Sequence, residues 1–349
     1  MQISLRRLRL QQHFSQRLSS AVVLLGVTAC SGSYPQSTLN PASDFGVAID
    51  NLFTGIFWWA VFVFVVVEGL LIITIVRFRA RPGRPKPKFI HGHTALEIGW
   101  TLAPAVILVF IAVPTIQTIF RHDGTAPDGA LQVEVVGHQW WWEFKYPEYG
   151  IVTATELHVA RGRPVALTMT SADVIHSFWI PRLGGKRDVI LNRVTRLAFT
   201  PDSVGVFMGQ CAEFCGASHA NMRATVVVDD AADFEAWIAS QQTPPTPVDS
   251  LSPLAQRGAG VFTERREPAS NSCIACHAID GVSFGVLGPN LTHLDSRARI
   301  AGGIIENNAM GLRRWLSDPP GAKPGSLMPN VSLTEAEIDA LVAYLQSLQ

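Results

Sequence analysis

Two long runs of apolar residues dominate the hydrophobic pattern of the chain. They cover residues 56–76 and 100–120, and each has about the length that a helix needs to cross roughly 30 Å of hydrocarbon. The segment between them, residues 77–99, carries six basic side chains, whereas the outer flanks carry almost none. These six are Arg77, Arg79, Arg81, Arg84, Lys86 and Lys88. The positive-inside bias therefore predicts a transmembrane hairpin with a cytoplasmic loop, and it places residues 30–55 and everything after residue 120 outside the cytoplasm.

The N-terminus has the order of an export signal. Four arginines among the first seventeen residues precede the short apolar run "AVVLLGVTA" and Cys30, and that run is too short to span a bilayer. The residues "VTAC" resemble a bacterial lipobox, which predicts a signal peptide over residues 1–29 and a lipid on Cys30. An ordinary signal peptide with an incidental cysteine is the alternative, and both place the mature N-terminus outside the cytoplasm.

Beyond the hairpin the pattern changes to short β-branched runs. The runs "LQVEVV", "RPVALTMT", "RVTRLAFT" and "RATVVVDD" are separated by Gly, Pro and Asp turns. Short strands at this spacing predict an all-β sandwich or barrel, over residues 126–238. Residues 239–253 are rich in Pro and Ser, and this composition predicts a linker.

Residues 254–349 follow a helical pattern instead. Near the C-terminus, five apolar positions recur at helical spacing, and Ser332 with Glu335 can form a capping box before them. We expect these positions to pack in the core of an all-α domain. They are Ile338, Leu341, Val342, Leu345 and Leu348.

Composition agrees with a membrane protein. The chain is 48% hydrophobic and 16% charged, which is more apolar than most soluble proteins. The formal net charge is zero, so nothing supports binding to nucleic acid. Glu68 lies inside the first apolar run, where a charge is costly. We interpret it as facing a partner helix, with a proton site as the alternative.

The stretch "GQCAEFCGASHANM" gathers Cys211, Cys215, His219 and Met222. Exported thiols normally form a disulfide, but thiolate, imidazole and thioether together are the soft donors that select copper. Zinc accepts Cys and His but has little use for Met. Two thiolates can bridge two copper ions and spread one electron over both. A second imidazole must come from elsewhere, and "DVIHSFWIP" supplies His176 in the turn after a predicted strand.

These two stretches resemble subunit II of the haem-copper cytochrome c oxidases, over roughly residues 50 to 235. The resemblance implies a cupredoxin-like Greek-key domain with the binuclear copper centre CuA. It implies bridging thiolates from Cys211 and Cys215, terminal imidazoles from His176 and His219, and further coordination by Met222 and the main-chain carbonyl of Glu213. The Glu213 side chain is then a ligand of Mg²⁺ at the border with subunit I.

The run "GHQWWWEF" places three tryptophans in sequence. On a strand, Trp140 and Trp142 share one face and Trp141 takes the other. Packing in the core or at the membrane interface explains at least one of them. The resemblance implies that electrons reach the copper through Trp140.

"ALEIGWTLAP", at the start of the second apolar run, matches a further segment of the same family. The resemblance implies that Glu97 lies at the mouth of a proton pathway into subunit I, and a solvated flank is the alternative. His91 and His93 are expected to be loop residues and not ligands.

"SCIACHAIDG" carries Cys273, Cys276 and His277 in the Cys-x-x-Cys-His order of covalent haem c attachment. A thioredoxin-like motif is the alternative, but it has no need for that histidine. The iron's sixth ligand should be a Met, because Met/His ligation raises the potential of a c-type haem. Met328 in "KPGSLMPN" resembles the Met-Pro of class I cytochromes c, whereas Met310 is expected to pack in the core. "GPNLTHL" likewise resembles the loop that supports the proximal histidine.

A CuA domain and a haem c domain on one chain resemble the caa3 type of cytochrome c oxidase. This implies electron transfer from cytochrome c to haem c, then to the copper pair and to haem a in subunit I, with subunit III as a further partner. Neither apolar run contains a histidine, so oxygen reduction belongs to subunit I. The alternatives are an anchored carrier for another reductase, such as a nitrous oxide reductase system, and a copper-storage or assembly protein. The expected location is the bacterial inner membrane, with both domains in the periplasm.

Overall fold

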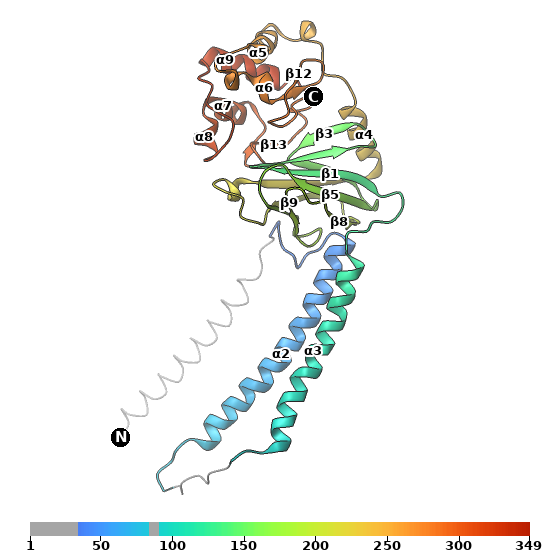
Figure 1. The fold of residues 1–349 in the computed structure, drawn as a ribbon, viewed down its shortest axis with the longest axis vertical. Coiled ribbons are helices and arrows are strands. Elements are labelled where there is room, and N and C mark those ends of the chain that lie inside the picture. Colours follow the sequence, from blue (N-terminus) through green and yellow to red (C-terminus); the bar gives the residue numbers. More distant parts are fainter. Residues whose placement is uncertain (1–33, 84–90) are drawn as a thin grey trace, which may run out of the picture. The chain divides into compact units, whose positions relative to one another are not determined.

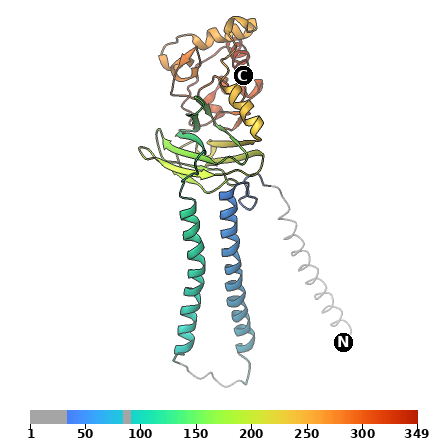
Figure 2. The same ribbon diagram turned by 90° about the vertical axis from the view of Figure 1, so that its right-hand side faces the viewer.

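The computed structural model describes residues 34–83 and 91–349. Two long helices, α2 (Asp44–Phe78) and α3 (Thr94–Arg121), form a hairpin and run side by side (Figures 1 and 2). Trp59 of α2 stacks on Phe110 of α3 with ring centroids 5.8 Å apart. The two predicted spans are therefore confirmed, although α2 begins inside the predicted segment 30–55 and α3 begins inside the predicted loop. The predicted signal peptide, Cys30, Arg84, Lys86 and Lys88 lie outside the described residues.

The start of α2 is built into the β-domain that follows the hairpin. The Ser43 hydroxyl accepts a hydrogen bond from the Gly46 amide (3.0 Å) and donates one to the Leu183 carbonyl (2.7 Å). The Asp44 carboxylate accepts a bond from the Thr200 amide at 2.7 Å. Because one hydroxyl serves both the helix N-cap and a β-domain loop, the helix axis is fixed to that domain.

The β-domain is a sandwich of two five-stranded sheets, which confirms the all-β prediction (Figure 1). One sheet has the order β3-β2-β1-β5-β8, and the other β4-β10-β9-β6-β7. The first contains β1 (Leu131–His138), β2 (Trp141–Tyr146), β3 (Ile151–Ala154), β5 (Val165–Ser171) and β8 (Thr195–Phe199). The second contains β4 (Glu156–Ala160), β6 (His176–Trp179), β7 (Arg187–Val189), β9 (Gly205–Cys211) and β10 (Arg223–Asp229).

Alternation along the strands explains the sandwich. In β1 and β5, every second residue is buried, and the two strands pair in parallel so that Leu131 lies opposite Val165 and Val135 opposite Met169. The inward residues of both sheets form one hydrophobic core. This core holds the strand ends rigidly, and the loops that carry the candidate ligands begin at those ends.

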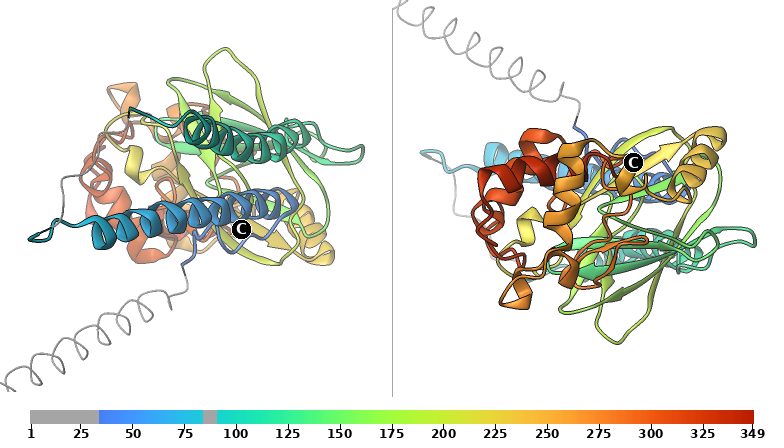
Figure 3. Two further views of the ribbon diagram at one scale, coloured as in Figure 1. Left: turned by 90° about the horizontal axis from the view of Figure 1, so that it is seen from below. Right: turned by 90° about the horizontal axis from the view of Figure 1, so that it is seen from above.

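The C-terminal region is helical, as predicted. It contains α5 (Pro253–Thr263), α6 (Cys273–Cys276), α7 (Ala309–Ser317), α8 (Pro319–Ala322) and α9 (Glu335–Leu345). Two short ladders accompany them: β11 (Ala278–Ile279) with β12 (Ser283–Phe284), and β13 (Arg299–Ile300) with β14 (Ile305–Glu306). Figure 3 shows this region from above. The predicted linker 239–253 begins with the end of α4 (Ala231–Gln241) and contains the 3-10 turn η2 (Val248–Ser250).

The predicted capping box of the last helix is wrong by two residues. Thr334, and not Ser332, caps α9, and its partner is Glu337. Both registers fit the Ser/Thr-x-x-Glu spacing, but only the later one lets Glu337 also pair with Arg266, on the segment between α5 and α6. Hydrogen bonds from the amide and hydroxyl of Thr334, together with Arg266, lower the pKa of Glu337 to about 2.

The crossing of α5 and α9 yields a test of the C-terminal core. A Cβ added at Gly258 would lie 2.0 Å from the Ala340 carbonyl oxygen, whereas one at Gly260 meets nothing within 4 Å. We expect Gly258→Ala to separate the helices and cost about 1–3 kcal/mol or more, which hydrogen exchange in α5 and α9 of the full chain measures. Gly260→Ala, the control, should leave exchange unchanged or slow it. Equal exchange in the two variants would contradict this packing.

Candidate metal centre

The candidate ligands sit on one closed loop between two paired strands. Cys211 is the last residue of β9, and Met222 directly precedes β10. A hydrogen bond from the Cys211 amide to the Met222 carbonyl (2.9 Å) closes the loop at its base. We call residues 211–222 the sulfur loop. Because the strand ladder fixes both ends, the loop returns its donor side chains to one small volume.

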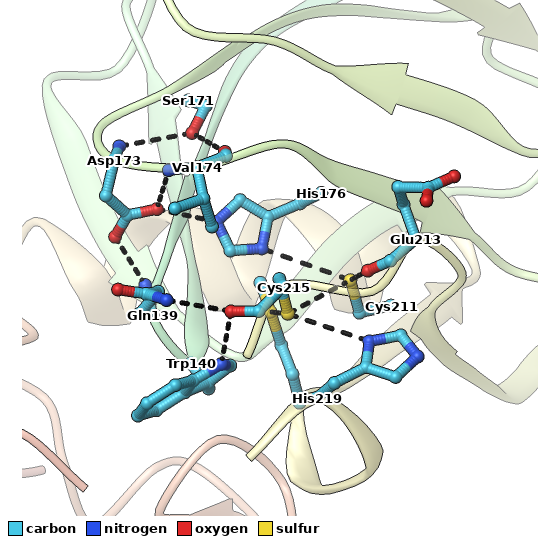
Figure 4. Close-up of polar contacts among 11 residues, drawn as sticks. Gln139, Trp140, Ser171, Asp173, Val174, His176, Cys211, Glu213, Cys215 and His219 are labelled. Carbon is cyan, nitrogen blue, oxygen red and sulfur yellow. Dashed lines mark hydrogen bonds and ion pairs between the residues drawn. The ribbon is translucent and has the colours of Figure 1, made fainter. Parts of the chain in front are cut away.

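Four soft donor groups meet there with His176, the first residue of β6 (Figure 4). The two cysteine sulfurs are 3.8 Å apart, far beyond the length of a disulfide bond. The Cys211 sulfur lies 3.9 Å from His176 Nδ1, and the Cys215 sulfur lies 3.6 Å from His219 Nδ1 and 3.9 Å from the Met222 sulfur. The structure thus brings together all five side chains that the sequence singled out.

The two thiols affect each other's pKa in opposite directions. The pKa of Cys211 is lowered because its sulfur accepts a hydrogen bond from Cys215, and this outweighs the effect of burial. The pKa of Cys215 is raised because its proton is held between the two sulfurs in a buried site. The proximity of the two sulfurs therefore favours the loss of one proton and opposes the loss of the second, and a bound cation would favour the loss of both.

Asp173 orients His176 toward the sulfurs. Its carboxylate lies 2.7 Å from His176 Nε2 and accepts a 2.7 Å hydrogen bond from the Gln139 amide (Figure 4). Burial alone would lower the pKa of His176, but the hydrogen bonds to Asp173 and Cys211 outweigh it and raise the pKa. A proton held on Nε2 leaves the lone pair of Nδ1 pointing at the sulfur loop, as a metal ligand requires.

Trp140 lies in the turn between β1 and β2, so its predicted place on a strand is wrong, although Trp140 and Trp142 are both buried in one core and Trp141 is only half-buried. His138 pairs with Trp141, and Gln139 with Trp140 makes the two-residue connection. The Trp140 indole donates to the Cys215 carbonyl at 2.9 Å, and the Gln139 side-chain amide donates to the same oxygen at 2.7 Å. The turn therefore holds the middle of the sulfur loop.

The carboxylates of the three glutamates that the sequence analysis discussed, Glu213, Glu97 and Glu68, do not contact the cysteine sulfurs. The carbonyl oxygen of Glu213 is 3.2 Å from the Cys211 sulfur, while its carboxylate points away (Figure 4). Glu97 lies in the first turn of α3, at the far end of the hairpin, and accepts a hydrogen bond from the backbone of His93, which caps the helix. Glu68 lines a groove between α2 and α3.

The C-terminal domain contains a cavity of about 370 Å³ that is lined by Cys273, Cys276, His277 and Met328. His277 Nδ1 lies 2.9 Å from the Pro289 carbonyl, which leaves Nε2 for a ligand role. Burial lowers the pKa of His277, so the ring stays neutral, as metal ligation requires.

The cavity walls fit a flat group with carboxylates. A Cβ added at Gly288 would lie 2.6 Å from the His277 ring, so only glycine lets the backbone pass there. The buried Arg297 lines the same cavity, and its Nε has no partner among the described residues. Its Nη2 donates to the Asn290 carbonyl, which leaves the Nε–H group for a carboxylate such as a propionate. Met310 lies elsewhere, on α7, with 78% of its side chain exposed, so the prediction that it packs in the core is wrong.

Comparison with known proteins gives matches along most of the chain. The profile "Cytochrome C oxidase subunit II, periplasmic domain" matches residues 153–230, its transmembrane counterpart matches 36–118, and "Cytochrome c" matches 255–349. Cytochrome c oxidase subunit 2 of Alkalihalophilus pseudofirmus is 35% identical over 98% of this chain and 99% of its own length. The chain belongs to the cytochrome c oxidase subunit II family. The subunit 2 of Bacillus sp. (strain PS3) is 39% identical over 78% of this chain and 80% of its own length.

A solved structure is also similar. The periplasmic domain of subunit II of cytochrome oxidase (CoxB) of Bradyrhizobium japonicum is 28% identical, with a TM-score of 0.33, over 34% of this chain and 97% of its own. Family membership implies copper and haem c as cofactors and a complex with other oxidase subunits. Two membrane-capable helices followed by the two matched domains give a bacterial membrane protein with both domains in the periplasm.

Sequence reasoning missed Asp173 and Gln139. Asp173 lies three residues before His176 in the stretch that was quoted for the histidine, and a carboxylate at that spacing is a typical partner of a metal-binding imidazole. Gln139 directly precedes Trp140 but gives no local signal, because its partner, the Cys215 carbonyl, lies 76 residues away.

Asp173→Asn tests the orientation of His176. An asparagine can present its amide oxygen to the ring but lacks the charge, so we expect copper affinity of the full chain to fall about 10- to 100-fold. Competition with a chelator of known affinity measures this. Asp128→Asn, at an exposed site of the same domain, is the control, and equal affinities in the two variants would remove Asp173 from this role.

Proposed function

We propose that the chain is the electron-accepting subunit of a caa3-type oxidase, which takes electrons from cytochrome c through its haem c and CuA and delivers them to haem a in subunit I. One observation carries this proposal. The five soft side chains converge on one buried volume, while Cys-x-x-Cys-His lines a cavity in the same chain, and Trp140 borders both. Subunit I reduces oxygen to water and couples this to proton pumping, with subunit III as a further component.

The copper ligands would be His176, Cys211, Cys215, His219 and Met222, with the carbonyl of Glu213. A copper pair held by these residues would supply a carrier of single electrons. The protein contributes the rigidity. Both ends of the sulfur loop are fixed by strand pairing, and its middle is held by the Trp140 turn, so the donors stay in place through each oxidation change.

In the C-terminal domain, Cys273 and Cys276 would bind haem c covalently, with His277 and Met328 as the axial ligands of the iron. Haem c supplies a one-electron carrier whose potential Met/His ligation raises. The Pro289 carbonyl fixes the His277 ring, and the apolar wall excludes water. Met328 lines the cavity, whereas Met310 is exposed, and this contrast supports the choice of Met328.

Further roles follow from the family resemblance. Trp140 would pass electrons toward the copper, and its indole bond to Cys215 supports this. The outward carboxylate of Glu213 would bind Mg²⁺ shared with subunit I, and Glu97 would stand at the mouth of a proton pathway. Cys30 would carry a lipid after removal of residues 1–29.

Two other functions are weaker. An anchored carrier that serves a nitrous oxide reductase system needs only some membrane anchor, whereas the transmembrane region of this chain matches that of the oxidase subunit. A copper-storage or assembly protein has no need for a second domain with a Cys-x-x-Cys-His cavity. Purification decides among the three. We expect the chain to copurify with a multi-helix subunit that contains haem a and to support oxygen consumption. A chain isolated without such a subunit, and inactive toward oxygen, would refute the proposal.

Cys215→Ser tests the copper pair. Serine keeps the shape but cannot bridge two copper ions as a thiolate, so the mixed-valence near-infrared band and the matching electron-resonance signal should vanish. The haem c spectrum of the same sample serves as the internal control, because Cys215 lies in the other domain. Survival of the mixed-valence signals would remove Cys215 from the site.

Met328→Ala tests the haem ligand. We expect a lower haem c potential and binding of external ligands such as imidazole to the iron, because the thioether that favours reduced iron is gone. Redox titration and optical spectra measure both. Met310→Ala is the matched control and should behave as the unmodified chain, whereas the opposite pattern would assign the ligand to Met310.

A further inference from the structure

The C-terminal domain contains one lysine, Lys323, and it is buried against the β-domain. Only 4% of its surface is exposed. Its ammonium donates hydrogen bonds to the Trp140 carbonyl at 2.6 Å and to the Ala301 carbonyl at 2.9 Å. Burial lowers the pKa of Lys323 to about 7, although the nearby Cys215 opposes the shift. A buried ammonium bound only to carbonyls is expensive, so its position calls for a function.

A second buried charge makes the matching contact from the other domain. Glu156 of β4 is 4% exposed. Its carboxylate accepts hydrogen bonds from the amides of Ala298 (2.9 Å) and Arg299 (3.0 Å), at the start of β13. Each domain thus contributes one charged side chain that binds main-chain groups of the other. Such charge-assisted contacts are directional, and they fix orientation as well as proximity.

The two domains also meet through further contacts with main-chain groups. The Arg223 amide donates to the Gly302 carbonyl at 2.8 Å, and the Ser218 hydroxyl of the sulfur loop donates to the Pro324 carbonyl at 2.6 Å. A Cβ added at Gly302 would lie 2.4 Å from the Trp140 carbonyl oxygen. The main chain of the C-terminal domain therefore lies in close contact with the β-domain.

Trp140 is enclosed by this contact. Only 7% of its surface is exposed. A Cβ added at Gly216 of the sulfur loop would lie 3.0 Å from Cζ2 of the indole, and one added at Gly325 would lie 3.2 Å from the neighbouring Cη2. Gly325 lies three residues before Met328. The indole therefore sits between the sulfur loop and the loop that lines the haem cavity.

We propose that Lys323 and Glu156 are positioning residues that hold the C-terminal domain in one fixed position over Trp140. The domain is then not a donor that swings on its linker, and the Trp140 face is closed to any separate redox protein. This inference rests on the proposed function for the electron step alone. In that step one electron leaves reduced haem c, which is oxidised, and reduces the copper pair, with no bond made or broken.

Amine acylation of the full chain in its oxidase complex tests this fixed position of the C-terminal domain, and it requires no electron transfer. With an acetyl succinimidyl ester as the probe, Lys323 should react at least about tenfold more slowly than Lys145, whose side chain is 39% exposed. Acylation after denaturation verifies that Lys323 can be detected. Equal rates in the folded complex would overturn the proposal.

Variants of Glu156 extend the same measurement. In Glu156→Gln the second contact is weakened, so acylation of Lys323 should accelerate at least about tenfold. Glu235→Gln, which changes an exposed carboxylate of the β-domain, is the control. Protection that is the same in both variants would exclude Glu156 from this role. This experiment remains informative even if a Lys323 variant fails to fold, because it leaves Lys323 unchanged.

Kinetics separate a positioning role from a merely structural one. In Lys323→Met, electron transfer from haem c to the copper pair after photoreduction should slow at least about tenfold, with both midpoint potentials unchanged. Arg265→Gln, an exposed cation of the same domain, is the control. An unchanged rate would overturn the proposal. Slow acylation of Lys323 in a chain that transfers no electron would support the fixed position of the C-terminal domain and refute the proposed function instead.

Discussion

Two sulfur atoms held 3.8 Å apart in a buried site cannot both be negative unless a cation lies between or beside them. This constraint organises the β-domain. The strand pair that closes the sulfur loop, the carboxylate that fixes the His176 ring and the indole that holds the Cys215 carbonyl all keep the donors together against their mutual repulsion. The β-domain keeps the two sulfurs close together, and a soft metal ion balances their negative charge. Rigidity and affinity for copper therefore have one origin.

The turn of Gln139 and Trp140 joins three parts of the molecule that are remote in sequence. The Gln139 backbone amide donates to Asp173, and the side chains of Gln139 and Trp140 donate to the Cys215 carbonyl. The Trp140 carbonyl accepts a hydrogen bond from Lys323. A displacement of the C-terminal domain therefore acts on the same few atoms that orient two candidate copper ligands. The fusion of the two domains therefore bears on the geometry of the candidate metal centre.

The sequence predicted the elements whose signals are local and missed those whose partners are distant. The sulfur loop and Cys-x-x-Cys-His are short patterns of rare residue types. The alternation of apolar and polar residues along a strand is likewise a local pattern that a short stretch of sequence shows. Lys323 and Glu156 are ordinary charged residues whose partners are backbone groups 183 and 142 positions away, so no local pattern marks them. Met310 was misplaced because α7 turns Leu312 and Leu316 to the core and leaves Met310 in solvent.

Ser43 joins the first turn of α2 to the Leu183 carbonyl, and this contact couples the tilt of the helix to that of the β-domain. A helix that is continuous with its extramembrane domain cannot tilt to match a thinner bilayer without tilting that domain too. The candidate metal centre is thus held in a fixed position relative to the hairpin. A change in lipid composition that tilts the hairpin tilts this centre with it.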